Sequence, residues 1–304
     1  MKKELERYYS DLKDKNYRLW QKRVAECEAK NPRFRALSEE PGRIMQQAVS
    51  GKISYAVASS RLGQVDAERK NLLISLGHPS DYLDMIYTCP ICKDKGYDPD
   101  TGKLCVCAMK KEQELMRSAS CVNDREIFPK FSEAIYPTDE QKKQGLGMKR
   151  FCERYVAALP KPEKPNLLIL GQSGLGKSFF ANAIAYAAID RGIRTVKATA
   201  YQCIQDILSG IEAREDAIRP YLSAELLILD DLGTEAMVPN VTVETVFRII
   251  NERSAAQLPT VLISNLDRDG LFERYGERVA SRMIDGALTS IVILRGDNLR
   301  TRMR

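Results

Sequence analysis

Long apolar runs are absent from this sequence. No apolar stretch reaches the ~18 residues that a helix needs to cross a membrane, so we expect no membrane partner. The first fifteen residues, MKKELERYYSDLKDK, are highly charged and have no apolar centre, which argues against a secretory signal. We therefore expect the protein in the cytoplasm, where its eight cysteines would be reduced thiols.

Histidine is almost absent too, and neither an internal repeat nor a low-complexity tract occurs. The single histidine, His78, lies eleven residues before Cys89, in the turn sequence GHPSD. A role in capping that turn is favoured over a role as a metal ligand. The remaining composition, 44% apolar and 29% charged residues, is typical of a globular protein. A net charge of +6 permits contact with nucleic acid without requiring it.

The chain of 304 residues is long enough for two domains, and its two halves differ in pattern. The first part has apolar residues at helical spacing, which predicts helices over residues 2–29, 39–49, 56–76 and 110–118. From about residue 151, short apolar runs alternate with helical patterns. These runs predict strands buried on both faces, at residues 166–170, 195–198, 226–229, 259–264 and 290–294. Strands that alternate with helices indicate an α/β fold built on a parallel sheet.

Four cysteines in the first part have the spacing of a metal site. Cys89-x2-Cys92 is followed by Cys105-x-Cys107 across a loop, KDKGYDPDTGK, whose Gly, Asp and Pro residues allow it to bend back. Four thiolates can close around one tetrahedral Zn²⁺. A catalytic zinc would need an open coordination position, and redox chemistry would need a βαβ setting, so the pattern favours a structural zinc. The other four cysteines are scattered and are interpreted as ordinary buried side chains.

The stretch GQSGLGKS has the G-x4-G-K-S pattern of a phosphate-binding loop and falls between a predicted strand and a predicted helix. Its glycines permit tight turns that expose backbone N–H groups, its lysine brings a positive charge, and its final hydroxyl can bind Mg²⁺. The helix N-terminus adds a partial positive charge. We therefore predict that a nucleotide is bound by all eight residues: Gly171, Gln172, Ser173, Gly174, Leu175, Gly176, Lys177 and Ser178.

Two further strand ends carry polar side chains suited to the same site. The stretch LLILDDLGTE places Asp230 at the carboxyl end of a strand, where it would hold the Mg²⁺ shell, mostly through water. Asp231 is the candidate that orients the attacking water, and the alternative is that it caps the following turn. The stretch TVLISN ends in Asn265, which would bond the γ-phosphate or the attacking water, or would simply form a turn.

Together, the segments GQSGLGKS, LLILDDLGTE, LPTVLISNL, RYGERVASRMIDG and RGDNLRTR resemble the AAA+ ATPases of the DnaC/DnaI helicase-loader group, a clade that also contains the transposition helper IstB. The resemblance covers about half of the chain, from near Phe128 to the end. It implies ATP as the nucleotide, with Asn265 as sensor 1, Arg282 as the arginine finger and Arg300 in a sensor 2 role. Arg278 is a second basic residue on the same helical face, one turn before Arg282.

An arginine finger acts on the nucleotide of a neighbouring subunit, so the resemblance implies assembly into a ring or spiral. The alternative for Arg278 and Arg282 is that both are solvated, or paired with Glu273 and Glu277.

The resemblance also implies a domain order. It predicts an AAA+ core with a five-stranded parallel sheet and no helical lid, preceded by a mainly helical domain with a structural zinc. The expected first domain, at residues 1–127, is helical, binds zinc and contacts the helicase. A linker with a joint helix follows at residues 128–165, and the ATPase domain occupies residues 166–304.

The implied function is ATP-dependent loading of the replicative hexameric DNA helicase in replication initiation, with ATP binding and hydrolysis as a switch. Many AAA+ proteins have Asp-Glu where this chain has Asp230-Asp231, and the shorter carboxylate reaches less far, so we expect slow hydrolysis. Single-stranded DNA is expected on the helical insert at residues 201–221, through Arg214 and Arg219. Two alternatives are kept. An IstB-like transposition helper is disfavoured by the cysteine-rich front end, and a zinc-stabilised DNA-binding adaptor with a structural nucleotide site is disfavoured by the intact ATPase motifs.

Overall fold

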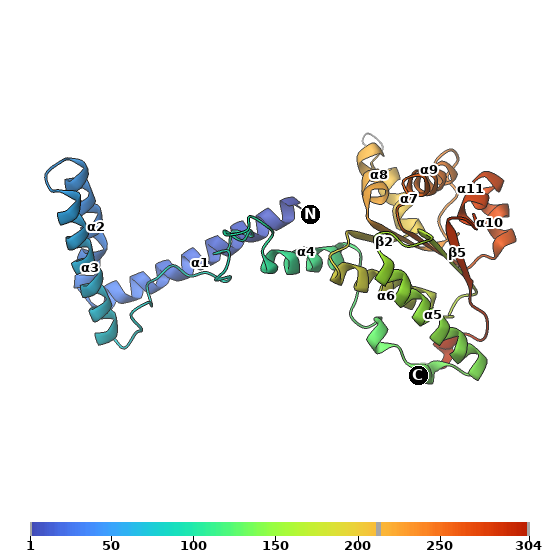
Figure 1. The fold of residues 1–304 in the computed structure, drawn as a ribbon, viewed down its shortest axis with the longest axis horizontal. Coiled ribbons are helices and arrows are strands. Elements are labelled where there is room, and N and C mark those ends of the chain that lie inside the picture. The colour runs from blue at the N-terminus through green and yellow to red at the C-terminus, as the bar shows by residue number, and fades with distance from the viewer. Residues whose placement is uncertain (1, 211–213, 303–304) are drawn as a thin grey trace. The chain divides into compact units, whose positions relative to one another are not determined.

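The computed structural model describes residues 2–210 and 214–302. The chain divides into two compact units, Met1–Met109 and Lys110–Arg304 (Figure 1). Among the described residues, no helix is both long enough and apolar enough to cross a membrane. The boundaries expected from the sequence, at residues 127 and 165, stay a prediction.

The first unit consists of three long helices and a cysteine-bearing segment: α1 (Lys2–Lys30), α2 (Pro32–Val49) and α3 (Tyr55–Ser75). All three were predicted, but α2 begins seven residues earlier than the apolar pattern indicates. Its start is explained by Asn31, whose side chain caps the helix by accepting from the Arg33 amide, and by Pro32 at the first helical position.

Within the first unit, α2 and α3 lie side by side (Figure 1) and bury an apolar seam that includes Leu37, Ile44 and Val65. A second cluster forms where α1 meets them, around Cys27 and Phe34. Both clusters are small, so burial alone supplies limited stability, and a metal cross-link in the same unit would add to it.

The second unit is built on one parallel sheet of five strands, in the order β2-β3-β4-β1-β5. Every strand predicted from an apolar run is present, and the largest difference is that the third extends three residues further than expected. The strands are β1 (Asn166–Leu170), β2 (Thr195–Thr199), β3 (Leu226–Leu232), β4 (Thr260–Ser264) and β5 (Thr289–Ile293).

Helices cover both faces of this sheet, which explains why its strands are apolar on both sides (Figure 1). One face packs against α5 (Asp139–Ala158) and α6 (Lys177–Asp190). The other face packs against α7 (Ala200–Ser209), α8 (Arg214–Ser223), α9 (Thr242–Ala255), α10 (Arg268–Tyr275) and α11 (Glu277–Met283). The helix α4 (Val106–Ala119) begins in the first unit and ends in the second, and three short 3-10 helices complete the fold: η1 (Phe128–Lys130), η2 (Glu133–Ile135) and η3 (Leu299–Arg302).

One buried guanidinium ties the amino end of β4 to the segment between α8 and β3. Arg253 is fully buried and donates to the hydroxyl of Thr260 at 2.9 Å. It also donates to the carbonyls of Ala224 at 2.8 Å and Pro259 at 2.7 Å. Burial lowers the pKa of Arg253 to about 10. Arg253 therefore holds together the loops at the amino ends of β3 and β4, the end of the sheet opposite the polar strand ends.

Candidate nucleotide site and four-cysteine cluster

The loop between β1 and α6 has the backbone shape that a phosphate cradle requires. Gly174 and Gly176 have φ angles of +86° and +84°, which side chains rarely tolerate. A Cβ at Gly174 would lie 2.0 Å from Oδ1 of Asn298, so a larger residue would have to displace that side chain as well as adopt a strained backbone. Gly176 directly precedes α6, so the first backbone N–H groups of that helix, which have no partner within the helix, are available to a phosphate held by the loop. The residues present therefore fit a bound phosphate.

The side chain of Lys177 lies inside this loop. Its ammonium donates to the carbonyls of Gly171 at 2.6 Å and Gln172 at 2.7 Å, and to Oδ1 of Asn265 at 2.7 Å. Burial lowers the pKa of Lys177, and the carboxylates of Asp230 and Asp231 act in the opposite direction. The arrangement keeps one positive charge at the place where outer phosphates would lie.

Two consecutive carboxylates follow the apolar part of β3. Asp230 is buried, and burial raises its pKa, with the charge of Asp231 adding to the effect and a hydrogen bond from Ser178 opposing it. The pairing of hydroxyl and carboxylate is the donor set that suits Mg²⁺. The predicted neighbourhood of Ser178 and Asp230 is therefore present in the structure.

Asp231 has a φ of +53°, an unusual value for a residue with a side chain, at the point where the register of β3 against β4 shifts. Its carbonyl closes the following turn, accepting from the amide of Thr234 at 3.1 Å and from its hydroxyl at 2.8 Å. Asp231 is also among the residues that line the cavity described next. The main-chain carbonyl of Asp231 therefore closes the turn at the border of the cavity.

A cavity of about 360 Å³ lies at the carboxyl ends of the strands, a volume within the usual range for small-molecule sites. Its lining includes the loop and three of the other predicted residues: Ser173, Gly174, Gly176, Lys177, Ser178, Asp231, Asn265 and Arg300. Gly171, Gln172, Leu175 and Asp230 shape or support the loop and do not line the cavity, and Leu175 is buried in the core. Neither Arg278 nor Arg282 lines it.

Sequence reasoning missed one wall of this cavity. Residues 128–165 were expected to form a linker and a joint helix, yet Phe131, Ile135 and Tyr136 line the cavity together with Phe179. The ring centroids of Phe131 and Phe179 are 6.0 Å apart, and those of Phe131 and Tyr136 are 5.8 Å apart. The signal available in the sequence was the concentration of aromatic residues from 128 to 136, which suits a planar base.

The C-terminal segment closes over the phosphate-binding loop. The amide of Leu299 donates to the carbonyl of Gly174 at 2.9 Å, and a guanidinium nitrogen of Arg300 lies 3.4 Å from the hydroxyl of Ser173. Arg300 therefore reaches the mouth of the cavity in its own chain, although it lies on η3 and not on a separate helical domain.

Arg278 and Arg282 lie on one face of α11, as their spacing predicts, but they do not pair with Glu273 or Glu277. Nε of Arg282 donates to Oδ1 of Asn251 at 2.8 Å, and a guanidinium nitrogen of Arg278 lies 4.0 Å from a carboxylate oxygen of Glu244. Both guanidiniums remain exposed. They stand outside the cavity of their own chain.

The four cysteines of the first unit come together. The sulfurs of Cys89, Cys92, Cys105 and Cys107 all lie within 4.8 Å of one another. Tetrahedral Zn–S bonds of about 2.3 Å put neighbouring sulfurs about 3.8 Å apart. The Cys89–Cys105 and Cys92–Cys107 pairs measure 3.9 and 3.5 Å, so the cluster can hold a zinc ion.

Polar residues around the cluster orient its ligands. The amide of Cys92 donates to the sulfur of Cys89 and lowers the pKa of that thiol to about 7, which favours a thiolate. The hydroxyl of Tyr9 lies 3.1 Å from the sulfur of Cys107. Buried Asp94 accepts from the amide of Cys89 at 2.8 Å and from Nδ2 of Asn16 at 2.8 Å. These contacts from α1 and from the loop are typical of a supported metal site.

His78 lies apart from this cluster, in the turn after α3. Its ring stacks on Tyr82 with centroids 4.2 Å apart, and its amide donates to the carbonyl of Leu73 at 3.0 Å. Among the described residues, the group of side chains that could share a metal ion consists of the four cysteines and does not include His78.

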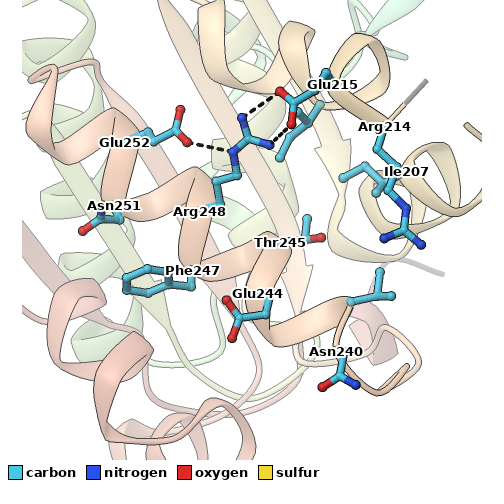
Figure 2. Close-up of a pocket in the computed structure, with 12 residues that line it drawn as sticks. Ile207, Arg214, Glu215, Asn240, Glu244, Thr245, Phe247, Arg248, Asn251 and Glu252 are labelled. Atoms are coloured by element: carbon cyan, nitrogen blue, oxygen red, sulfur yellow. Dashed lines mark hydrogen bonds and ion pairs between the residues drawn. The ribbon is translucent and has the colours of Figure 1, made fainter. Parts of the chain in front are cut away.

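The predicted DNA-contacting insert corresponds to α7 and α8, although residues 211–213 lie outside the described part. Arg219 pairs with Asp216 at 2.6 Å, and Arg214 lines a second pocket of about 390 Å³ between α8 and α9. Figure 2 shows Arg248 of α9 in this pocket, with bonds to both carboxylate oxygens of Glu215 on α8, at 2.6 and 2.8 Å. The insert is thus fastened to α9 by an ion pair.

The second half of the chain matches a family of known proteins. Residues 154–304 fit the family model described as IstB-like ATP binding protein. The replicative helicase loader DnaC of Buchnera aphidicola subsp. Acyrthosiphon pisum is 28% identical over 189 residues, which are 58% of this chain and 70% of that protein. The insertion sequence IS5376 putative ATP-binding protein of Geobacillus stearothermophilus is 31% identical over 46% of this chain and 57% of its own length. The replicative helicase loader DnaI of Bacillus subtilis is 24% identical over 63% of this chain and 64% of its own length.

A five-stranded parallel sheet with a phosphate-binding loop after β1 and polar residues at the carboxyl ends of β3 and β4 defines an ATP-binding protein of the AAA+ type. The matched half of the chain is an IstB-like AAA+ ATPase related to the DnaC and DnaI helicase loaders, and the N-terminal helical region carries a four-cysteine cluster. The family and the fold class expected from the sequence are both confirmed.

Proposed function

We propose that this chain is an ATP-dependent loader of the replicative DNA helicase in the initiation of DNA replication. The observation that carries the proposal is a nucleotide-sized cavity, in which Lys177, Asp231 and Asn265 meet, in a chain similar to proteins named replicative helicase loaders. ATP binding and slow hydrolysis serve as a switch, and single-stranded DNA is bound during the cycle.

Each residue of the cavity has a part in this proposal. Loop amides and Lys177 bind the outer phosphates, and the hydroxyl of Ser178 and the carboxylate of Asp230 hold Mg²⁺. Asp231 and Asn265 orient the attacking water. ATP supplies a phosphoanhydride bond whose cleavage changes the charge in the cavity. Because aspartate is shorter than glutamate, Asp231 places its carboxylate less favourably for this task, which suits a timed switch.

The base of the nucleotide packs against the aromatic wall, which supports a planar ligand better than a simple phosphate ion. Phe131 and Tyr136 supply uncharged aromatic faces, against which a planar purine base can pack. Arg300 contributes a positive charge in its own chain at the mouth of the cavity.

Arg282 acts on the nucleotide of a neighbouring subunit, with Arg278 as a second cation beside it. Both guanidiniums are exposed and lie outside the cavity of their own chain, which supports a role at a subunit boundary. The active form is therefore a ring or spiral of these chains.

The N-terminal domain grips the hexameric helicase. Zinc bound by the four cysteines holds that domain folded, because its apolar clusters are small. The proposed boundaries are residues 1–127 for this domain, 128–165 for the linker and joint helix, and 166–304 for the ATPase domain.

A second candidate is a transposition helper. The match to the IstB-like model and the 31% identity to an insertion-sequence ATP-binding protein favour it for the ATPase half. The cysteine cluster lies outside the matched residues and favours the loader. A DNA-binding adaptor with a purely structural nucleotide site is the third candidate, and any multiple-turnover ATP hydrolysis would exclude it.

Co-purification separates the first two candidates. The full chain is mixed with the host replicative helicase, and separately with an IS21-type transposase, in the presence of ATP or ADP. A loader retains the helicase hexamer and not the transposase, with a yield that depends on the nucleotide. Retention of the transposase alone would overturn the proposal.

A further inference from the structure

Two arginines of α11 share one aromatic ring on α9. The guanidinium carbon of Arg278 lies 3.7 Å from the centroid of Phe247, and that of Arg282 lies 4.9 Å from it. A ring attracts cations over its face, so one phenyl group holds both guanidiniums. Phe247 is half-buried and packs against the apolar core between the sheet and helices α7 to α11.

The same face of α9 carries two polar anchors. Glu244, Phe247 and Asn251 are spaced three and four residues apart, so they lie along one side of the helix, as Figure 2 shows. Asn251 accepts from Nε of Arg282 at 2.8 Å, and Glu244 lies 4.0 Å from Arg278. Each arginine is thus restrained by the shared ring and by one polar side chain.

A free arginine on a surface samples many rotamers, and fixing it at a reaction site costs conformational entropy. Arg282 makes three contacts. Its Nε donates to Asn251, one terminal guanidinium nitrogen donates to the carbonyl of Arg278 at 3.2 Å, and the guanidinium lies over the ring of Phe247. The other terminal nitrogen has no bond among those described. A guanidinium held in this way is oriented before any phosphate reaches it.

We propose that Phe247 and Asn251 are positioning residues that hold Arg282, and with it Arg278, ready for the nucleotide of a neighbouring subunit. The inference rests on the proposed trans action of Arg282. It adds two residues of α9 to the boundary, neither of which touches a nucleotide in its own chain, since neither lines the cavity at the loop. Loss of either would lower turnover and leave nucleotide affinity unchanged.

The α8–α9 ion pair adds to this support. Arg248, the residue after Phe247, is held by Glu215 of α8 and by Glu252 of its own helix at 2.7 Å. The helix that carries the ring is therefore braced on its neighbouring face (Figure 2).

A complementation experiment tests the inference. Five variants of the full chain are prepared: Phe247→Leu, which keeps an apolar side chain without the ring, Phe247→Tyr, which keeps the ring, Asn251→Ala, Arg282→Ala and Lys177→Ala. We expect ATP affinity to be unchanged in Phe247→Leu while its turnover falls about tenfold, since two cation–ring contacts are lost. Phe247→Tyr should stay within about twofold of the unmodified chain, and Asn251→Ala should lose severalfold.

Mixed assemblies identify which side of the boundary is damaged. Phe247→Leu chains have an intact cradle, so mixing them with Lys177→Ala chains, whose arginines are intact, should restore part of the turnover. Mixing Phe247→Leu with Arg282→Ala should restore none, because both lack a working finger. A defect of folding would differ in the first mixture, since an unfolded Phe247→Leu chain would not be rescued by Lys177→Ala chains.

The outcomes distinguish failure of the positioning role of Phe247 and Asn251 from failure of the trans action of Arg282. If Arg282→Ala and Lys177→Ala chains co-assemble but recover no activity together, trans action itself is wrong and the inference falls with it. If that pair recovers, the inference alone is overturned by either of two results: full turnover in Phe247→Leu, or recovery when Phe247→Leu is mixed with Arg282→Ala.

Discussion

The ammonium of Lys177 donates a 2.7 Å hydrogen bond to Oδ1 of Asn265, a residue 88 positions later in the chain. The bond joins the phosphate-binding loop after β1 to the polar end of β4, the neighbouring strand in the sheet. A ligand that draws the ammonium outward would release Asn265 to bond a phosphate or a water. The two side chains therefore act as one unit at the centre of the cavity.

Lys177→Ala should lose most of the affinity for ATP, because it removes the side-chain cation of the loop and leaves phosphate charge to the amides alone. Titration with a fluorescent ATP analogue measures this loss, which we expect to be at least 100-fold, or about 2.7 kcal/mol. Lys161→Ala, which removes an exposed lysine of the same compact unit, serves as the control for the loss of one charge. Equal affinity in both variants would mean that the nucleotide binds elsewhere.

Asp230→Asn should stabilise the fold at neutral pH and abolish Mg²⁺-dependent turnover. Burial raises the pKa of Asp230, so its folded form favours the proton, and ionisation at neutral pH disfavours folding. The stability that the protonated group contributes is present below its unfolded pKa and is lost as the pH rises through the raised folded value.

Thermal melts of the unmodified chain and of Asp230→Asn at pH 5 and pH 7 check the sign. The variant should melt higher at pH 7, by about 2–4 °C for each ~1 kcal/mol relieved, and the gap should narrow at pH 5. A lower melting temperature of the variant at pH 7 would show that the carboxylate is stabilised by its surroundings.

One zinc per chain is expected, bound by the four cysteines. A Cys→Ser substitution at Cys89, Cys92, Cys105 or Cys107 should remove the metal and melt the N-terminal helices, while ATP affinity is retained. The exposed Cys121 gives a matched control, since Cys121→Ser should keep the full metal content. Elemental analysis of protein purified under reducing, chelator-free conditions decides between one zinc and none, and a result of none would refute the metal site.

Single-stranded DNA is expected to bind more tightly with ATP and through Arg214 and Arg219 of α8. Removing both arginines should lower the slope of log affinity against log salt by about 1.4, at ~0.7 for each phosphate contact on a single strand. The control is the double variant Arg150→Ala and Arg154→Ala, which removes the same charge from α5 on the opposite face of the sheet. Equal effects of the two pairs, or equal affinity for duplex DNA, would place the DNA elsewhere.

The strands of the sheet were predictable from the sequence because they are buried on both faces. A continuous apolar run such as residues 226–229 identifies a strand of this kind even when its partner strands are unknown. The loop from Gly171 to Ser178 and the position of the two aspartates at the carboxyl end of β3 were predictable because their sequence patterns are local. The aromatic wall at Phe131 and the ring of Phe247 were not, since each depends on contacts between residues far apart in the chain.

Backbone detail shows the same limit. The start of α2 at Pro32 depends on a cap at Asn31, and the turn after Asp231 is closed by a main-chain carbonyl. Apolar periodicity carries neither piece of information.

The measurement that tests the central claim most directly is helicase transfer to a closed single-stranded DNA circle. A circle has no end to thread, so the hexamer must be opened or assembled around it. Circles are incubated with helicase and ATP, with the full chain or its Lys177→Ala variant, and bound helicase is counted after a salt wash. The loader account predicts a severalfold gain with the unmodified chain and no gain with the variant. Equal amounts of helicase on circles with and without this chain would contradict it.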